Sequence, residues 1–372
     1  MRQDVIARQM RAVRDAGLDA IVSITPESFA HVTGFLSPTA PIMRWRHAIA
    51  VVTLDGAVSL AVVDMEANTI RARLPPGTDI AVWHEFKFDA MDVLADVLRK
   101  RGLAKGRIGI ELDYLPAADH AALQALLPEA KFEAAQNILA RLRQIKTPAE
   151  IDILRRLSRI ADKAITDAYL SVRAGATEMD LAAALTRGVY AQGAEYFKLM
   201  IVATGERSVF PNVGPTERVL KRGDVCRVEI FPMIGGYHAG VCRTAAVGAP
   251  PPEAERIWAN LTACKYLLLA AIKPGASCKG IYDLYRAKLS ELGLPPISFI
   301  GHGIGLHLHE DPYLGPTDDQ ALEAGMVLGI EPLVYETGFG FGMQNKDMVL
   351  VTDTGCELLS DYADTDRLII VP

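Results

Sequence analysis

The segment RQIKTPAEIDILRRL most constrains how this chain can fold, because it marks the start of a long helix in the interior of the sequence. Thr147 is placed as the helix N-cap, Pro148 stands at the first helical position, and Glu150 is placed to complete a capping box. Apolar residues then recur at helical spacing over the following turns. The chain has 372 residues, and single domains usually hold roughly 100–200 residues. We therefore expect two domains, over residues 1–138 and 139–372.

Before this helix, the sequence alternates between helical and strand patterns. From Ala48 to Asp64, two apolar runs flank Asp55-Gly56, which predicts a β-hairpin. Helical periodicity from Asp89 to Arg101 is followed by a short apolar strand pattern from Ile108 to Glu111. This succession predicts a small α/β domain.

After the boundary, strands and helices no longer alternate strictly. A second capped helix is predicted to begin after Thr177, with Asp180 at the capping-box position. Two later helices separate two groups of strand patterns, which lie near residues 199–203, 224–231, 237–245, 299–302, 326–331 and 348–352. This order is typical of an α+β domain whose sheet carries helices on one face.

The composition narrows the class of partner. Half of the residues are hydrophobic and 23% are charged, which is typical of a globular protein. The net charge of −6 and the absence of a long Lys/Arg run argue against nucleic acid and membrane surfaces, so we expect a small-molecule substrate. No uninterrupted apolar run reaches the roughly 18 residues of a membrane-spanning helix. The five cysteines form no CxxC pair, which indicates reduced thiols in a cytoplasmic protein.

Several phrases of the second domain occur in an order that resembles one known family. They include GHGIGLHLHEDP, with His302 and His309 seven residues apart, and GMVLGIEP, which contains Glu331. With RQIKTPAEI, GDVCRVEIFPMIGGYHAGVCRTAAVG, IKPGASC and FGMQNKDMVLVTDTG, they resemble the pita-bread family of aminopeptidase P, prolidase, methionine aminopeptidase and creatinase. The resemblance implies an α+β pita-bread catalytic domain, preceded by a smaller α/β domain of the creatinase type.

The resemblance also implies an altered metal centre. Peptidases of this family hold two divalent ions with two Asp, one His and two Glu, and at these positions the chain has Glu229, Gly240, His302, Glu331 and Lys346. Gly240 offers no ligand, and Lys346 brings a cation where an ion would bind, so the resemblance implies no metal cofactor. Lys346 is then expected to pair with Glu229 or Glu331 and keep it ionised. The alternative is that Lys346 extends into solvent.

Two members of the fold that work without metal share further features with the chain. FPMIGGY, an Arg-Thr pair and IKPGASCKGI resemble creatinase, while Glu229-Ile230 and Tyr237-His238 resemble ectoine hydrolase. The chain departs from creatinase at Asn212 and Cys242, where a catalytic histidine and a carboxylate are expected, which argues against creatine itself as substrate. The main hypothesis is a metal-independent hydrolase that cleaves a C–N bond in an amidine, guanidine or amide with a carboxylate group.

Five residues are candidates for the catalytic chemistry: Glu229, His238, His302, His309 and Glu331. A buried carboxylate can activate water or attack directly, and histidine can pass a proton near neutral pH. Each histidine can instead be a hydrogen-bonded structural residue.

Four residues are candidates for substrate binding: Arg46, Asn212, Tyr237 and Lys346. The stretch MRWRHAIAVV aligns Arg46 with an arginine that in creatinase reaches the partner subunit's site and binds the substrate carboxylate. A guanidinium group suits such bidentate binding, so the resemblance implies a homodimer. The alternative is a solvated arginine.

Two other functions stay open at this point. One is a metal-dependent Xaa-Pro aminopeptidase or dipeptidase that holds a single ion, because three protein ligands suffice for a catalytic zinc. The ligands would come from Glu229, His302, Glu331 and His238. A catalytically inactive member of the fold can also serve as a binding protein.

Overall fold

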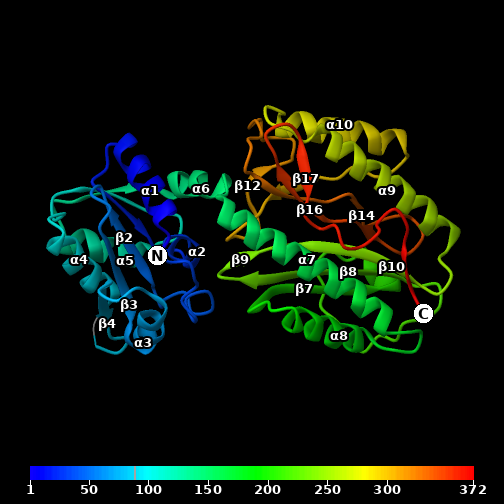
Figure 1. Ribbon diagram of the computed structural model, residues 1–372, viewed down its shortest axis with the longest axis horizontal. Helices are drawn as coiled ribbons and strands as arrows, with labels where there is room; N and C mark the ends of the chain where they lie inside the picture. The colour runs from blue at the N-terminus through cyan, green and yellow to red at the C-terminus, as the bar shows by residue number, and fades with distance from the viewer. Residues whose placement is uncertain (88) are drawn as a thin grey trace. The chain divides into compact units, whose positions relative to one another are not determined.

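The computed structural model describes residues 1–87 and 89–372, and the chain divides into two compact units, Met1–Arg143 and Gln144–Pro372 (Figure 1). The units are described separately below.

The first unit contains one six-stranded mixed sheet in the order β4-β3-β2-β1-β5-β6. Its strands are β1 (Ala20–Ser23), β2 (Ile49–Thr53), β3 (Val58–Val63), β4 (Asp79–Trp83), β5 (Arg107–Ile110) and β6 (Lys131–Ala134). Its helices are α1 (Gln3–Asp15), α2 (Pro26–Thr33), α3 (Asp64–Arg73), α4 (Ala90–Lys100) and α5 (Ala117–Leu126), and α6 (Gln136–Gln144) follows the last strand. Strands β2 and β3 pair antiparallel, which confirms the predicted hairpin, and Gly56 has the positive φ of 80° that its turn requires.

Each face of this sheet is covered by helices. In β1, Val22 packs into one apolar core with α4 and α5, whereas its neighbour Ile21 packs into another with α1, α2 and α3. Successive strand residues point to opposite faces, so a strand buried on both faces must be apolar throughout. All four residues of β1 are buried.

The second unit begins with the predicted capped helix. The side chain of Thr147 accepts a hydrogen bond from the backbone of Glu150, and the Glu150 carboxylate accepts one from the backbone of Thr147. Thr177 and Asp180 form a second capping box in the same way. The helices are α7 (Pro148–Ser171), α8 (Glu178–Ala191), α9 (Pro252–Ala271) and α10 (Cys278–Glu291), with a short 3₁₀ helix η1 (Gly205–Val209).

Two sheets form the centre of this unit. One has the order β18-β10-β8-β7, with β9 beside β8, and the other has the order β12-β11-β13-β16-β17. The first contains β7 (Tyr196–Thr204), β8 (Val225–Ile234), β9 (Tyr237–His238), β10 (Val241–Val247) and β18 (Ile369–Val371). The second contains β11 (Gly301–Gly303), β12 (Glu310–Tyr313), β13 (Val327–Ile330), β16 (Asp347–Val351) and β17 (Cys356–Leu358), and β14 (Leu333–Val334) pairs with β15 (Met343–Gln344).

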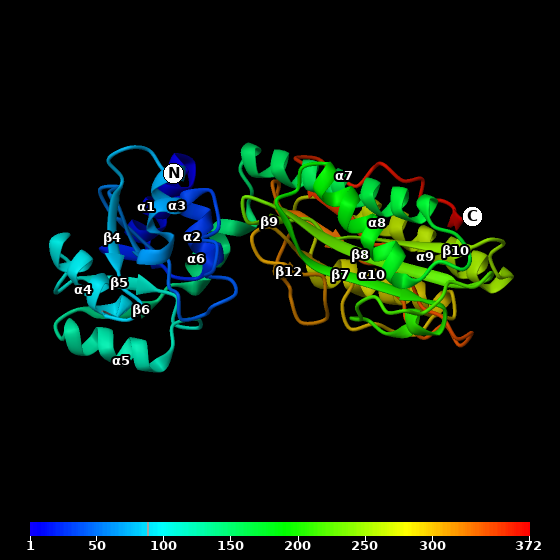
Figure 2. The same cartoon turned by 90° about the horizontal axis from the view of Figure 1, so that it is seen from below.

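Helices flank these strands, as Figures 1 and 2 show. Helices α7 and α8 contact the sheet of β7, β8 and β10, while α9 and α10 share an apolar core with β13 and β16. The arrangement is of the α+β class that the sequence predicts. The prediction of a single sheet with helices on one face is wrong, because the strands form two main sheets, each with its own pair of helices. Over residues 1–87 and 89–372, none of the helices is both long enough and apolar enough to span a lipid bilayer.

A buried ionic network joins the two sheets. Arg243 in β10 pairs with Asp162 in α7 and with Asp347 in β16, at 2.8 Å in each case. Lys265 in α9 also pairs with Asp347, at 2.8 Å. Buried charges are tolerated only when they are paired and hydrogen-bonded, so this network favours one relative position of the sheets.

Candidate active site

The strand order of the second sheet brings three of the predicted site residues together. Strands β11 and β16 flank β13 as antiparallel neighbours. His302 in β11 lies opposite Gly329 in β13, Glu331 directly follows β13, and Lys346 directly precedes β16. Gly329 leaves room for the side chains of His302 and Lys346, because a Cβ atom there would lie 3.2 Å from Cε of Lys346 and 3.5 Å from Nε2 of His302.

A fourth residue comes from the first sheet. Lys346 and Cys242 form an isolated β-bridge with two backbone hydrogen bonds of 3.2 Å. Cys242 lies opposite Glu229 in the pairing of β10 with β8. The bridge therefore brings the side chain of Glu229 to the same point as His302, Glu331 and Lys346.

The ammonium group of Lys346 lies at the centre of this cluster. Its Nζ is 3.0 Å from Oε1 of Glu229, 2.9 Å from Oε1 of Glu331 and 3.2 Å from Nε2 of His302. It also lies 4.7 Å from the ring centroid of Phe231. The four cluster residues are buried, and Lys346 is 1% exposed. The prediction that Lys346 pairs with these carboxylates is confirmed, and the alternative that it extends into solvent is wrong.

The charges of the cluster stabilise one another. Burial disfavours the charged form of Lys346, but the charges of Glu229 and Glu331 outweigh it and raise the pKa of Lys346 above its ordinary value of 10.5. Burial also opposes ionisation of Glu331, but the positive charge of Lys346 outweighs it and lowers the pKa of Glu331 well below its ordinary value. The site therefore holds an ammonium and an ionised carboxylate at neutral pH.

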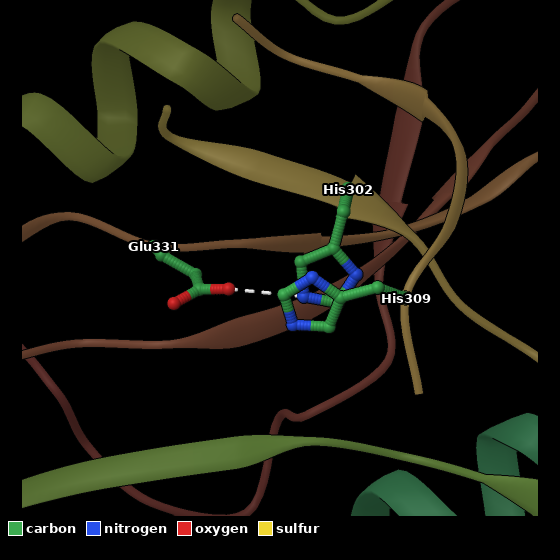
Figure 3. Close-up of side chains that lie close together, drawn as sticks. All are labelled: His302, His309 and Glu331. Carbon is green, nitrogen blue, oxygen red and sulfur yellow. Dashed lines mark ion pairs between the residues drawn. The ribbon is translucent and has the colours of Figure 1, made fainter. Parts of the chain in front are cut away.

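His302 and His309 stack on each other beside Glu331 (Figure 3). Their ring centroids are 3.6 Å apart and their planes differ by 13°. Nε2 of His302 lies 3.0 Å from Oε1 of Glu331, and Nδ1 of His302 lies 2.7 Å from the carbonyl oxygen of Gly303. A carbonyl oxygen can only accept, so Nδ1 carries a proton, and in the neutral ring Nε2 is the acceptor. Partial removal from water, together with the neighbouring His302 and Lys346, lowers the pKa of His309 to about 4, although the side chain is exposed on one side.

Sequence reasoning missed two residues that hold the cluster in place. Nε2 of Gln344 donates to Oε2 of Glu331 at 3.0 Å, and Oε1 of Gln344 accepts from Arg227 at 3.0 Å. Arg227 also donates to the carbonyl oxygens of Phe210 and Pro211. Arg227 lies two residues before Glu229 on β8, so the alternation of strand side chains was a signal that could have found it.

At Gly240 there is no space for a metal-binding side chain. A Cβ atom at Gly240 would lie 2.3 Å from Cε1 of Phe231, well inside van der Waals contact. The ring of Phe231 therefore fills the space into which an aspartate at this position would extend.

Other predicted residues lie outside the contacts of the cluster. His238 in β9 is 2% exposed, and its Nδ1 lies 3.2 Å from the carbonyl oxygen of Gly305, in the segment that links His302 and His309. Burial lowers the pKa of His238 to about 4, so it is neutral at pH 7. The hydroxyl of Tyr237 donates to Glu150 at 2.7 Å and thereby joins β9 to α7.

The substrate-binding roles of Asn212 and Arg46 remain predictions. Asn212 is exposed in the loop after η1, next to Pro211. Arg46 belongs to the first unit, where its guanidinium group lies 2.8 Å from Oε2 of Glu85. The homodimer in which Arg46 would reach a partner's substrate also stays a prediction.

The donor atoms present do not fit a two-ion centre. Gly240 supplies no ligand, and the ammonium of Lys346 lies where an ion shared by Glu229 and Glu331 would bind. Ligand atoms of His302, His309 and Glu331 lie within 4.8 Å of one another. However, the two imidazole rings are nearly parallel, so their nitrogen lone pairs, which lie in the ring planes, do not converge on one point.

Comparisons with known proteins identify the family. Residues 152–353 match the model of metallopeptidase family M24, and residues 6–145 match the creatinase/prolidase N-terminal domain. The chain belongs to metallopeptidase family M24. Its two domains are thus a creatinase-type N-terminal domain and an M24 pita-bread domain, as the sequence predicts.

Several of the similar proteins are dipeptidases by name. The chain is 32% identical over 264 residues to the probable dipeptidase PepE of Mycobacterium tuberculosis. The matched region covers 70% of this chain and 68% of that protein. It is 30% identical over 291 residues to an Xaa-Pro dipeptidase of Lactobacillus helveticus, covering 76% and 77%. The structure of an Xaa-Pro dipeptidase from Bacillus anthracis superposes with a TM-score of 0.85 at 26% identity and 99% coverage of both chains.

These comparisons correct the main functional hypothesis. The prediction of a metal-independent hydrolase of the creatinase or ectoine hydrolase type is wrong, because the relatives are dipeptidases of a metallopeptidase family. Similarity along most of the chain favours the alternative, an Xaa-Pro peptidase. The residues altered at a few metal-ligand positions form only one part of the site. By themselves they do not indicate which substrate the domain binds.

Proposed function

We propose that this protein is a dipeptidase that hydrolyses the amide bond of a short peptide, with Xaa-Pro dipeptides as the first substrates to test. The similar proteins from Mycobacterium tuberculosis and Lactobacillus helveticus supply the substrate class. One structural observation supports it most directly: a cavity of dipeptide size is lined by Phe299, whose ring lies close to that of His309.

The cavity has a volume of about 480 Å³, within the roughly 300–1,000 Å³ of small-molecule sites. Its lining includes Pro295, Phe299 and Tyr335. The ring centroid of Phe299 lies 6.1 Å from that of His309, which places the cavity beside the stacked histidines. Mostly apolar walls suit an apolar side chain or the pyrrolidine ring of proline.

The cluster offers groups for amide hydrolysis. The reaction needs a water directed at the carbonyl carbon and a proton for the leaving nitrogen. In this proposal, Glu229 or Glu331 orients the water as a hydrogen-bond acceptor. His309, at the exposed edge of the ring stack, accepts a proton from the attacking water and passes it to the leaving nitrogen as the C–N bond breaks. The hydrogen bond from Gln344 keeps the carboxylate of Glu331 in a fixed orientation.

The test is a substrate screen with purified protein. Xaa-Pro dipeptides, other dipeptides and creatine are incubated with the protein, both as purified and with added Mn²⁺, Co²⁺ or Zn²⁺, and the released amino acids are quantified by mass spectrometry. We expect cleavage of at least one Xaa-Pro dipeptide, and its loss in the Glu331→Gln variant. A folded protein that cleaves no dipeptide under any of these conditions would overturn the proposal and favour a binding role.

A further inference from the structure

The position of Lys346 carries an inference about ion binding that is independent of the substrate. We propose that the ammonium of Lys346 is a built-in competitor for the cation position between Glu229, His302 and Glu331, so that this cluster binds divalent ions weakly until the charge of Lys346 is removed.

The ammonium group contacts three acceptor atoms in this position. A lysine ammonium has three N–H donors, and three acceptors lie within 3.2 Å of Nζ: one oxygen of Glu229, one oxygen of Glu331 and Nε2 of His302. Nδ1 of His302 is engaged with a backbone carbonyl, which leaves Nε2 as the acceptor. The ammonium is therefore surrounded by two carboxylate oxygens and one imidazole nitrogen.

An ion held by the same three side chains would need the same space. Carboxylate oxygens and imidazole nitrogens bind zinc at about 2.0–2.2 Å. Nζ lies between 2.9 and 3.2 Å from all three acceptors, so an ion bound to them would lie close to Nζ. The ion and the ammonium therefore exclude each other by size as well as by charge. Two cations a few ångströms apart in a buried site repel each other much more strongly than in water.

The surroundings hold Lys346 in place. Its side chain is 1% exposed, and the ring of Phe231 lies 4.7 Å from Nζ. The missing side chain of Gly329 leaves space for its Cε atom. To release the position, Lys346 would have to break three charge-assisted contacts and move within a packed interior.

The experiment measures ion binding rather than turnover. Wild-type protein, Lys346→Gln and the charge-retaining control Lys346→Arg are stripped with chelator, checked for native circular dichroism, and titrated with Zn²⁺ and Mn²⁺ by equilibrium dialysis with elemental analysis. We expect Lys346→Gln to bind about one ion at least ~10-fold more tightly than the wild type, a change that corresponds to about 1.4 kcal/mol. Lys346→Arg should bind as weakly as the wild type.

A second substitution locates the ion. In the Lys346→Gln background, His302→Ala should abolish the added binding, because it removes the imidazole ligand of the cluster. Wild-type protein that binds an ion as tightly as Lys346→Gln, and loses it on His302→Ala, would overturn the proposal. If Lys346→Gln fails to fold, ion affinity is measured instead on the wild type and on the single variant His302→Ala. Tight binding by the wild type that is lost in His302→Ala refutes the inference, and weak binding by the wild type supports it.

The outcome is separable from the proposed function. Dipeptide cleavage is scored by released amino acids, whereas this inference is scored by ion affinity. Either can fail while the other holds.

Discussion

Nζ of Lys346 lies 2.9 Å from Oε1 of Glu331, with both side chains buried in the pita-bread domain. The two residues leave neighbouring strands at the point where β13 ends and β16 begins. A third charged residue, Glu229, belongs to the other sheet, and its Oε1 lies 3.0 Å from the same Nζ. This relationship makes Lys346 a structural as well as an electrostatic centre of the site.

The stability of the fold should depend on this charge. In buffer without divalent ions, Lys346→Met is expected to lower the free energy of unfolding by roughly 3–5 kcal/mol, because it leaves two buried carboxylates without a cation. Urea denaturation at pH 7 measures the change. Adding Glu229→Gln and Glu331→Gln to Lys346→Met should recover part of the loss, and a Lys346→Met protein as stable as the wild type would contradict the role of the pair.

Catalysis should depend on the carboxylate of Glu331. Glu331→Gln keeps the shape of the side chain but removes its charge, so kcat on the best dipeptide should fall by about 10²-fold or more. The matched control is Glu217→Gln, at an exposed glutamate of the same domain, which should keep near-normal kcat. Equal activity of the two variants would remove Glu331 from the catalytic machinery.

The buried His238 should make stability pH-dependent. Burial lowers the pKa of His238 from 6.5 to about 4 in the folded protein. Between these values the unfolded chain holds a proton that the folded chain does not, so stability is full above pH 6.5 and is lost as the pH falls toward 4. The loss is on the order of 3 kcal/mol.

Urea denaturation at several pH values tests this prediction. His238→Gln should show a flatter decline than the wild type between pH 6.5 and 4, because glutamine does not titrate. Parallel declines in the two proteins would show that His238 is not the residue responsible.

The packing of Phe231 against Gly240 should resist any side chain at position 240. Gly240→Ala would place Cβ 2.3 Å from the ring, and overpacking of this kind typically costs about 1–3 kcal/mol. In a double-mutant cycle, Gly240→Ala should cost less in a Phe231→Leu background than in the wild type. Additive effects would mean that the two positions do not compete for the same space.

The elements that the sequence predicts correctly depend on local interactions. Thr147 and Glu150 lie three residues apart, so their capping box can form within a single turn, and the structure contains it. The hairpin turn at Asp55-Gly56 depends on the few residues around it. The family phrases around His302 and Glu331 predicted the fold, and the pairing of Lys346 followed from the charges at matching positions.

Tertiary structure alone decided how the rest of the site is built. Gln344 in β15 contacts Glu331, and Arg227 in β8, which is distant in sequence, contacts Gln344, so both contacts depend on how these strands pack together. The ring of Phe231 fills the space beside Gly240 for the same reason. Capping boxes and tight turns are determined within a few residues, whereas a site at the junction of two sheets exists only after long-range pairing has placed its side chains. The sequence by itself therefore determined the helices, the hairpin and the family, and the folded structure determined which buried groups surround the ammonium of Lys346.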